Sequence, residues 1–451
     1  MGLRVLVLLL VSIVAASPIF PVQSPIIQDH TQGYQFDPLL HLPGISPYFD
    51  AVGYGLQHAA PPACRVTAAS YLIRHAAIYA NDAEYEEYIK PFLWKLEKHR
   101  QGWSGPLAFM SKWVSPILEE HLEDITPSGA EDAKKVGAHL VKRYPKLAPT
   151  VKKILADKKL RTFDTAVAFA KSFPKHEDIE VVQFIHNHNG SLDSLTPHKS
   201  CAAFNKKPGT KEMAEFVHNY APTVSERLAR FTPFELSDND VIGLQSLCGY
   251  ESAIRGERSP ICGVFLDSEW FAYEYAWDLK YAAMVGPLNP LSPYLGFPWL
   301  KAQSELFQQL ENSDDPSGSN TGPGWPPSQR FFLSFTHREV PPFVATALGI
   351  FNSSSPAVEE FPTDHINWAR SWKMSDLIPF LGHVGMEKMT CDSHSGRKGD
   401  YIRVISNTAP RPIPDCQDGP GASCAMEQWV DMISKGAEKY KDFDEVCSKA
   451  S

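Results

Sequence analysis

The stretch VTAASYLIRHAAIYA, residues 66–80, decides the fold class of this protein. Its first part, Val66–Ile73, combines apolar side chains with Ser, Thr and Tyr, a composition that predicts a β-strand. Arg74 and His75 follow directly, and helical spacing of apolar residues begins near Glu84. Sites in α/β sheets form where the carboxyl ends of strands deliver side chains. We therefore expect Arg74 and His75 at such an edge.

Strand-like and helix-like segments alternate along the rest of the chain. The strand-like segments are residues 180–185, 331–335, 387–389 and 401–405, and the helix-like ones are 84–100, 128–144, 161–173, 211–232, 267–284 and 341–351. Residues 151–160 fit either the end of a helix or a strand. This alternation predicts an α/β fold with helix-rich insertions. Acidic residues between 82 and 87, among them Glu84, are expected to be solvated, since acids suit a helix N-terminus.

The composition indicates a globular chain that does not bind nucleic acid. Hydrophobic residues make up 43% of the 451 residues and charged residues 21%, which argues against a disordered chain. The 43 Lys and Arg residues are outnumbered by 52 Asp and Glu residues, giving a formal net charge of −9. Binding to a nucleic-acid backbone needs clustered basic residues, and this sequence scatters them. A small anionic substrate still fits, because a local cationic pocket can lie in an acidic protein.

The N-terminus has the pattern of an export signal. A positive charge at Arg4 precedes the apolar run Val5–Val14, and small residues that fit a cleavage site follow it. We predict a signal peptide over residues 1–16 and an irregular lead-in over residues 17–62. The apolar run is too short to span a bilayer, and no other run approaches 18 residues. The protein is therefore expected to be secreted and to have no membrane partner.

The cysteines agree with an extracellular chain. Their even number in an exported protein predicts disulfides. The sequence has no C-x-x-C pair, and His186-Asn187-His188 lacks an accompanying carboxylate or cysteine cluster, so we expect no metal and no cofactor. Sequons at Asn189 and Asn352 predict two glycosylation sites. The cysteines are Cys64, Cys201, Cys248, Cys262, Cys391, Cys416, Cys424 and Cys447.

Several separated motifs resemble those of one enzyme family. Residues 71–80 (YLIRHAAIYA) resemble the R-H-G-x-R-x-P signature of the histidine acid phosphatases, which include the fungal phytases. Residues 161–166 (RTFDTA) resemble the R-x-x-x-[ST]-A element of that family, and residues 334–337 (SFTH) resemble the strand that ends in its second catalytic histidine. Residues 259–275 and 286–291 are similar to further segments of fungal phytases. The motifs occur in the same order as in that family.

The resemblance implies a phosphoglycerate mutase-like fold. This fold has a central mixed, mostly parallel sheet flanked by helices, and a smaller helical cap. The family region would span residues 63–451, with the α/β core roughly at 63–80, 145–200 and 325–451 and the cap roughly at 81–144 and 205–310. The resemblance also implies the disulfide pairs Cys64–Cys391, Cys201–Cys447, Cys248–Cys262 and Cys416–Cys424.

The resemblance further implies hydrolysis of phosphate monoesters through a phosphohistidine at His75. Arg74, Arg161 and His337 would bind the phosphate. The nucleophile must be a neutral imidazole, and nearby guanidinium groups lower the pKa of a histidine, which keeps a lone pair available in acid. The expected partners are therefore small phosphate esters. Inositol hexakisphosphate and simpler esters both fit the sequence, and the oligomeric state stays open.

Four positions depart from the family motifs, and two of them change the charge. Ile78 replaces the second arginine of the signature, which removes a charge-assisted contact to phosphate worth roughly 1.5–3 kcal/mol. Arg338 stands where the family has the aspartate that donates a proton to the leaving group, and arginine cannot serve because it does not deprotonate in proteins. Ala76 and Ala80, in place of glycine and proline, change backbone freedom more than chemistry.

Two hypotheses restore activity. In the first, Glu339 is the proton donor, since residues two apart in an extended chain point the same way and Glu339 would face the pocket with His337. The related multiple inositol polyphosphate phosphatases carry H-A-E at this place. In the second, Arg338 turns inward, binds the substrate and replaces the charge lost at Ile78. Adjacent residues on a strand point apart, so only a turn would allow both.

The sequence predicts a secreted acid phosphatase of the phytase type. The alternative is a catalytically impaired relative that binds phosphate or has a structural role outside the cell, because two catalytic positions deviate. A third class, a carbohydrate-binding protein, would use some of the 10 Trp as sugar platforms, but burial of these aromatics explains them more simply. Turnover of an aryl phosphate between about pH 2.5 and 6 separates the first two classes.

Overall fold

This computed structural model describes residues 36–51, 53, 55–184, 194–312, 324–351, 360–392 and 398–448. The predicted signal peptide, the first part of the lead-in and His186-Asn187-His188 lie outside these residues, as do the predicted glycosylation sites Asn189 and Asn352. The expectations for these segments stay predictions.

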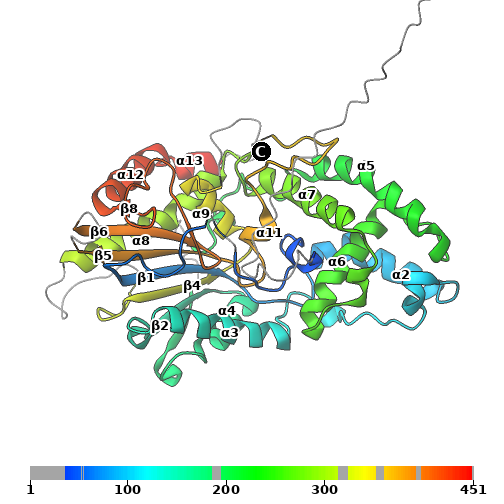
Figure 1. Cartoon of the computed structure of the whole chain (residues 1–451), viewed down its shortest axis with the longest axis horizontal. Coiled ribbons are helices and arrows are strands. Elements are labelled where there is room, and N and C mark those ends of the chain that lie inside the picture. The colour runs from blue at the N-terminus through cyan, green and yellow to red at the C-terminus, as the bar shows by residue number, and fades with distance from the viewer. Residues whose placement is uncertain are drawn as a thin grey trace, which may run out of the picture. The chain divides into compact units, whose positions relative to one another are not determined.

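A mixed sheet of eight strands is the framework of the fold (Figure 1). Seven strands follow the order β3-β2-β4-β1-β5-β6-β7, and β8 pairs with β6. The strands β3, β2, β4 and β1 run parallel, whereas β5 to β8 pair antiparallel with their neighbours. The mixed α/β sheet expected from the sequence is confirmed, but the expectation that it is mostly parallel is wrong: among the described strands three pairings are parallel and four are antiparallel. The strands are β1 (Cys64–Arg74), β2 (Lys153–Asp157), β3 (Glu180–Phe184), β4 (Phe331–Thr336), β5 (His383–Cys391), β6 (Gly399–Ser406), β7 (Ala409–Arg411) and β8 (Cys424–Ala425).

The helices fall into two groups, one that covers the sheet and one that lies beyond its end, on the right of Figure 1. The first group comprises α3 (Pro127–Arg143), α4 (Leu160–Ala170), α8 (Ser292–Asn312), α9 (Val340–Leu348) and α12 (Met426–Lys439). The second comprises α1 (Asp82–Glu84), the π-helix η2 (Tyr85–Ile89), α2 (Lys90–Lys98), α5 (Thr210–Leu228), α6 (Asp238–Arg255) and α7 (Asp267–Met284). Two shorter helices are α11 (Met374–Leu377) and α13 (Phe443–Ser448).

Both faces of the sheet are covered, which explains why β4 and the second half of β1 are buried without interruption. On the face of α3 and α4, Leu140 and Phe169 share a core with Ile73 of β1. On the opposite face, Leu72 of β1 belongs to the core that contains Phe343 of α9. Leu72 and Ile73 thus serve different cores, as the two-residue period of a strand requires.

The structure differs from the sequence-based expectations in several helices. Of the two alternatives left open for residues 151–160, the strand is present as β2, and α4 begins at Leu160. The helices α6, α8 and α12 were not predicted; α6 is buried from Asp240 to Ala253 without interruption, so its sequence has no polar face to reveal a helical period. Helix α3 lies in the range 81–144 that was assigned to the cap, yet it packs with α4 against the sheet. Helix α8 lies largely in the range 205–310 that was also assigned to the cap, yet its Gln303 accepts a hydrogen bond from Ser70 of β1. The rest of the division into core and cap stays a prediction.

The four disulfides join the cysteines that the family resemblance pairs: Cys64–Cys391, Cys201–Cys447, Cys248–Cys262 and Cys416–Cys424. The first connects β1 to β5 at positions that lie opposite each other in the ladder. The second ties α13 to the segment before α5. Since these two bridges close loops of 327 and 246 residues, they restrict the unfolded chain strongly.

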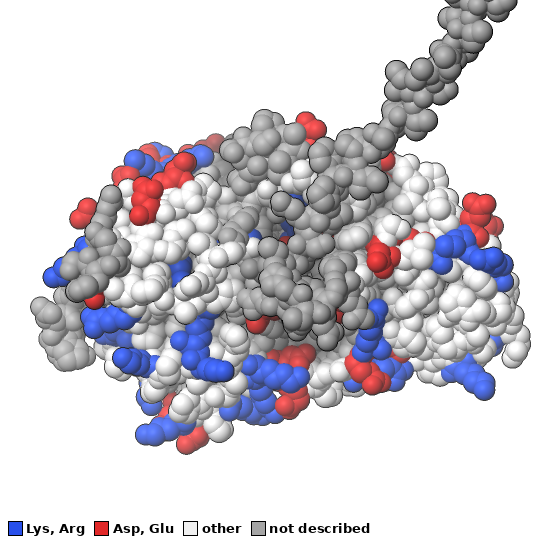
Figure 2. Space-filling view, viewed as in Figure 1, with Lys and Arg blue, Asp and Glu red and all other residues white. Residues whose placement is uncertain are grey.

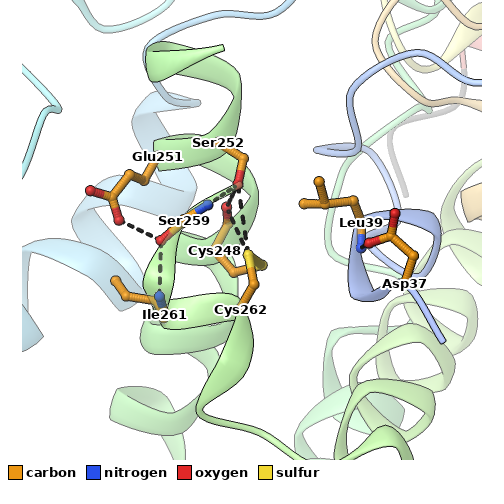
Figure 3. The surroundings of a disulfide bond; sticks show 8 residues. All are labelled: Asp37, Leu39, Cys248, Glu251, Ser252, Ser259, Ile261 and Cys262. Atoms are coloured by element: carbon orange, nitrogen blue, oxygen red, sulfur yellow. Dashed lines mark hydrogen bonds between the residues drawn. A yellow bond between two sulfur atoms is a disulfide. The ribbon is translucent and has the colours of Figure 1, made fainter. Parts of the chain in front are cut away.

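The Cys248–Cys262 disulfide joins α6 to the turn before α7 (Figure 3). Ser252 lies beside it, donates to the carbonyl oxygen of Cys248 at 2.6 Å, and accepts from the backbone N–H of Ser259 at 2.9 Å. Ser259 in turn donates to the carboxylate of Glu251 at 2.5 Å. These bonds fix the turn against α6, so the disulfide adds to a connection that hydrogen bonds already define.

Charged side chains on the face shown in Figure 2 are mixed in sign, with Lys and Arg most frequent at the lower left, over β2, α3 and α4. Basic residues in this region form ion pairs with acids close to them, for example Lys134 with Glu131 and Lys152 with Asp178. Within the described residues, no helix has the length and apolar character needed to cross a bilayer.

A buried carboxylate, Glu387 of β5, joins three segments of the fold. It accepts hydrogen bonds from the guanidinium of Arg143 at 3.0 and 3.1 Å, from Arg403 at 2.6 Å and from the hydroxyl of Tyr144 at 2.5 Å. Arg143 and Arg403 also donate to the backbone carbonyl of His58. The carboxylate therefore balances two guanidinium groups that fasten the lead-in to the sheet.

Replacing Glu387 with alanine should destabilise the protein by about 3–5 kcal/mol, because two buried cations lose their partner. Denaturant unfolding followed by circular dichroism measures the change. The matched control is Glu131→Ala, which removes an exposed partner of Lys134 and should leave the stability nearly unchanged, because solvent screens this ion pair. Equal stabilities of the two variants would contradict the argument.

Candidate active site

The carboxyl ends of three parallel strands deliver the predicted residues to one edge of the sheet. Arg74 ends β1 and lies opposite Thr336, the last residue of the adjacent β4, so that His75 and His337 leave the sheet together. Their ring centroids are 5.8 Å apart. Arg161 lies in the first turn of α4, which follows β2. A single small cavity brings together Arg74, His75, Ile78, Asn81, Glu123, Arg161, Lys206, Tyr250, His337, Arg338 and Glu339.

His75 is held with one ring nitrogen protonated and the other free for chemistry. Its Nδ1 lies 2.9 Å from the carbonyl oxygen of Ala76, and because a carbonyl can only accept, the proton is on Nδ1. The lone pair of the neutral ring is therefore on Nε2. Burial, followed by the charges of Arg74, Arg161 and His337, lowers the pKa of His75 well below 6.5. The ring stays neutral under mildly acidic conditions.

Arg74 supplies a buried positive charge directly beside this ring. One guanidinium nitrogen donates to the carbonyl oxygen of Ile378 at 2.8 Å, and the guanidinium carbon lies 4.5 Å from the centre of the Phe380 ring. Burial and the nearby Arg338 lower the pKa of Arg74 to about 10, so it keeps its charge in acid. Its Nε has no hydrogen-bond partner among the described residues. Arg74 is thus held in place and positively charged, and its Nε–H is a donor without a partner among the described residues.

The other cations of the cavity are each paired with a carboxylate. Arg161 contacts Glu123 at 2.5 Å, and Lys206 contacts Glu339 at 2.6 Å. Arg338 binds Glu84 and also approaches Asn81 at 3.5 Å. An anion that enters the cavity must compete with these carboxylates for the cations.

Arg338 and Glu339 both line the cavity, although they are neighbours in the sequence. Strand β4 ends at Thr336, the following residues form a turn, and Glu339 has helical backbone angles of φ −80° and ψ −31° before α9 begins. The turn removes the strand geometry that would send adjacent side chains to opposite sides. Arg338 shares the cavity with Ile78, which is the placement that the second hypothesis requires.

Glu339 is ionised in this structure. Burial raises the pKa of its carboxyl group, but the charges of Lys206, His198, Arg338 and His337 outweigh burial and hold the pKa well below 4.5. The side chain of Lys206 is 57% exposed, whereas that of Glu339 is 4% exposed. Glu339 is therefore a buried carboxylate held by a cation that can leave toward solvent.

Sequence reasoning missed three carboxylates of this region, Glu84, Asp157 and the partner of Arg161, Glu123. Glu84 was expected to be solvated, but it is buried, binds Arg338 and accepts from the hydroxyl of Tyr250 at 2.5 Å. Asp157, at the end of β2, binds His337 at 2.8 Å and Lys199 at 3.2 Å. Reading residues 151–160 as a strand would have placed Asp157 at the carboxyl edge, whereas no local pattern marks Glu84.

The chain matches the family model of the histidine phosphatase superfamily (branch 2) over residues 65–407. It is 28% identical to the acid phosphatase PHO1 of Komagataella pastoris over 428 residues, which cover 92% of this chain and 87% of that protein. Phytase A of Aspergillus oryzae is 25% identical over 452 residues, with coverages of 94% and 95%.

Solved structures share the fold. The phytase from D. castellii has a TM-score of 0.77 at 23% identity and covers 92% of this chain and 88% of its own. The multiple inositol polyphosphate phosphatase of Bifidobacterium longum, in complex with phosphate, has a TM-score of 0.63 at 12% identity, with coverages of 87% and 97%.

His75 should remain neutral at pH 5.5, below the ordinary histidine pKa of about 6.5, because protonation would bury a charge among guanidinium groups. Nitrogen chemical shifts of 15N-histidine-labelled protein report the protonation state. Arg161→Met should raise the pKa of His75, since one like charge is removed, whereas the exposed Arg65→Met should leave it unchanged. A His75 midpoint at or above 6.5 in the unmodified protein would overturn the assignment.

Proposed function

The chain belongs to the histidine phosphatase superfamily (branch 2), and we propose that it hydrolyses small phosphate monoesters through a phosphohistidine at His75. The family predicted from the sequence is thereby confirmed, and the chain is a phosphatase of the acid phosphatase and phytase type. The observation that carries the proposed mechanism is the neutral Nε2 of His75 beside the buried charge of Arg74. A neutral nucleophile among cations suits a dianionic phosphoryl group.

The proposed reaction has two displacements at phosphorus. In the first, the lone pair of His75 Nε2 forms a P–N bond, the ester P–O bond breaks, and the leaving oxygen takes a proton to become an alcohol. In the second, water attacks phosphorus, the P–N bond breaks, and inorganic phosphate leaves with His75 restored. Arg74, Arg161 and His337 offset the charge on the equatorial oxygens in both steps.

Glu339 is the proposed proton donor of the first step and the acceptor of the water proton in the second. In the free site it is a carboxylate bound to Lys206. A phosphate dianion placed beside it raises the pKa of the carboxyl group and attracts Lys206 away, and both effects favour the protonated acid. Activity should therefore be highest in acid and fall as pH rises and the complex loses this proton.

Arg338 is proposed to bind the substrate in place of the arginine that the family motif has at position 78. It lines the cavity with Ile78 and lies close enough to Arg74 to lower the pKa of that guanidinium. The number of guanidinium groups available to phosphate is then three, Arg74, Arg161 and Arg338. Secretion and glycosylation are part of the same proposal, supported by the export pattern of the N-terminus and by the four disulfides.

A second candidate function is phosphate binding without turnover. The ion pair between Glu339 and Lys206 favours it, because an acid that never regains its proton cannot assist the leaving group. The two functions differ in one measurement, the release of phosphate from an aryl phosphate between about pH 2.5 and 6. Release that disappears in His75→Ala supports the enzyme, and phosphate binding without release supports the alternative.

Glu339→Gln should lower the hydrolysis of an alkyl phosphate by about 100- to 10,000-fold, because an alkoxide needs a proton to leave. The loss should be much smaller for 4-nitrophenyl phosphate, whose phenolate leaves without one. Rapid quench into alkaline denaturant should then trap labelled phosphohistidine in both proteins, since the P–N bond survives in alkali. The control Glu86→Gln changes an exposed carboxylate and should have no effect. Equal losses on both esters, or no loss, would remove Glu339 from this role.

Replacing Arg338 with methionine should lower kcat/KM for phosphate esters by about 10- to 100-fold, the loss expected for one charge-assisted contact. The same change leaves the buried carboxylate of Glu84 without its cation. The double variant Arg338→Met/Glu84→Gln removes this unpaired charge, so that its kinetics report the loss of the Arg338 cation alone. Steady-state kinetics and inhibition by inorganic phosphate measure both. A double variant as efficient as the unmodified protein would show that Arg338 does not bind substrate.

A further inference from the structure

The carboxylate of Asp157 is built into the same edge of the sheet but does not line the cavity. It lies at the end of β2, is completely buried, and approaches Nε2 of His337 at 2.8 Å. Lys199, at the end of the short 3-10 helix Pro197–Lys199, contacts both carboxylate oxygens at 3.2 and 3.3 Å. The backbone N–H of Lys159 donates to Asp157 at 3.1 Å. The carboxylate is thus held by three different segments.

These contacts decide which nitrogen of His337 carries the proton. Asp157 is ionised, since burial would raise its pKa but His337 and Lys199 lower it far below 3.8. An ionised carboxylate can only accept a hydrogen bond, so Nε2 of His337 must be the donor. The ammonium group of Lys199 lies 3.3 Å from the same nitrogen, but a protonated Nε2 and an ammonium are both donors and form no hydrogen bond with each other. Lys199 therefore donates to Asp157.

The other nitrogen of His337 is left for the cavity. Nδ1 is buried and has no hydrogen-bond partner within the described residues. His337 lines the cavity, whereas Asp157 is not among the lining residues. Since the Asp157 side of the ring is occupied, Nδ1 is the nitrogen that can reach a phosphoryl oxygen.

We propose that Asp157 is a positioning residue: by accepting a hydrogen bond from His337 Nε2, it fixes the ring so that Nδ1 faces the phosphoryl group, and it stabilises the imidazolium that donates from Nδ1. This role rests on the proposed phosphatase function of the cavity. Carboxylates that orient a catalytic histidine act in this way in other enzymes.

Charges from several elements determine how readily His337 takes a second proton. Burial and the charges of Arg161 on α4 and Lys199 lower its pKa, whereas Asp157 and Glu339 raise it, and the result in the free protein is a pKa of about 4. His75 also faces the ring. A bound phosphoryl dianion adds negative charge, so the imidazolium forms in the complex at a higher pH than in the free protein.

The test is Asp157→Asn, which keeps the size of the side chain but removes its charge. We expect kcat for 4-nitrophenyl phosphate to fall by about 10- to 100-fold. The leaving group of this ester needs no proton from Glu339, so we expect its alkaline limb to follow His337 and to move to lower pH, because the imidazolium loses its anion. The control Asp178→Asn changes an exposed carboxylate near Lys152 and should match the unmodified protein.

A second variant separates this role from a purely structural one. Lys199→Met removes a cation that lowers the pKa of His337, so the alkaline limb should move to higher pH, opposite to the shift in Asp157→Asn. General damage to the site would not move the two profiles in opposite directions. Alkaline limbs that move in the same direction in both variants, or that do not move in either, would overturn the proposal.

A third measurement does not need turnover. Nitrogen shifts of 15N-histidine-labelled protein should show the neutral His337 with its proton on Nε2, and in Asp157→Asn this preference should decrease. An unmodified protein that binds inorganic phosphate and shows this tautomer, but releases no phosphate from esters, would reject the proposed function and keep the positioning role. An active protein in which His337 carries its proton on Nδ1 would reject the positioning role alone.

Discussion

The parallel pairing of β1 with β4 is the constraint on which the site depends. In this register Arg74 lies opposite Thr336, so that the next residues of both strands, His75 and His337, leave the sheet side by side. β2 pairs with β4 along its other edge and brings Asp157 to the same level. A slip of one residue would turn each of these side chains to the other face, so the helices that bury both faces also fix the site.

The second constraint is the balance of buried charge around His75. The cavity gathers guanidinium groups that attract phosphate, and burying them alone would be costly. The fold offsets the charge of Arg161 and Arg338 with Glu123 and Glu84, and it places the carbonyl of Ile378 and the ring of Phe380 against Arg74. Arg74 therefore has no carboxylate of its own among the described residues and is the cation most available to an incoming anion.

The segment after His75, where the sequence departs from the family signature, is held by contacts with residues 123–126. Ile78 is buried and forms an isolated β-bridge with Ile125, so an apolar residue suits this position. Backbone bonds from Thr126 to Ala77 at 2.8 Å and from Glu123 to Ala80 at 2.9 Å hold the rest of the loop. The charge absent from position 78 is present in the same cavity at Arg338, which a motif search by position alone would count as a loss.

The sequence by itself determined the family, the α/β class and the convergence of His75 with His337, because these follow from ordered motifs and from strand ends that meet at one edge. The disulfide pairs followed only from the resemblance to that family. It did not determine how Arg338 and Glu339 share a cavity, since that depends on where β4 ends and the chain turns. Nor did it reveal Glu84 and Asp157, whose partners lie 254 and 180 positions away in the chain. Ion pairs between such distant residues leave no local pattern, so only packing in three dimensions decides them.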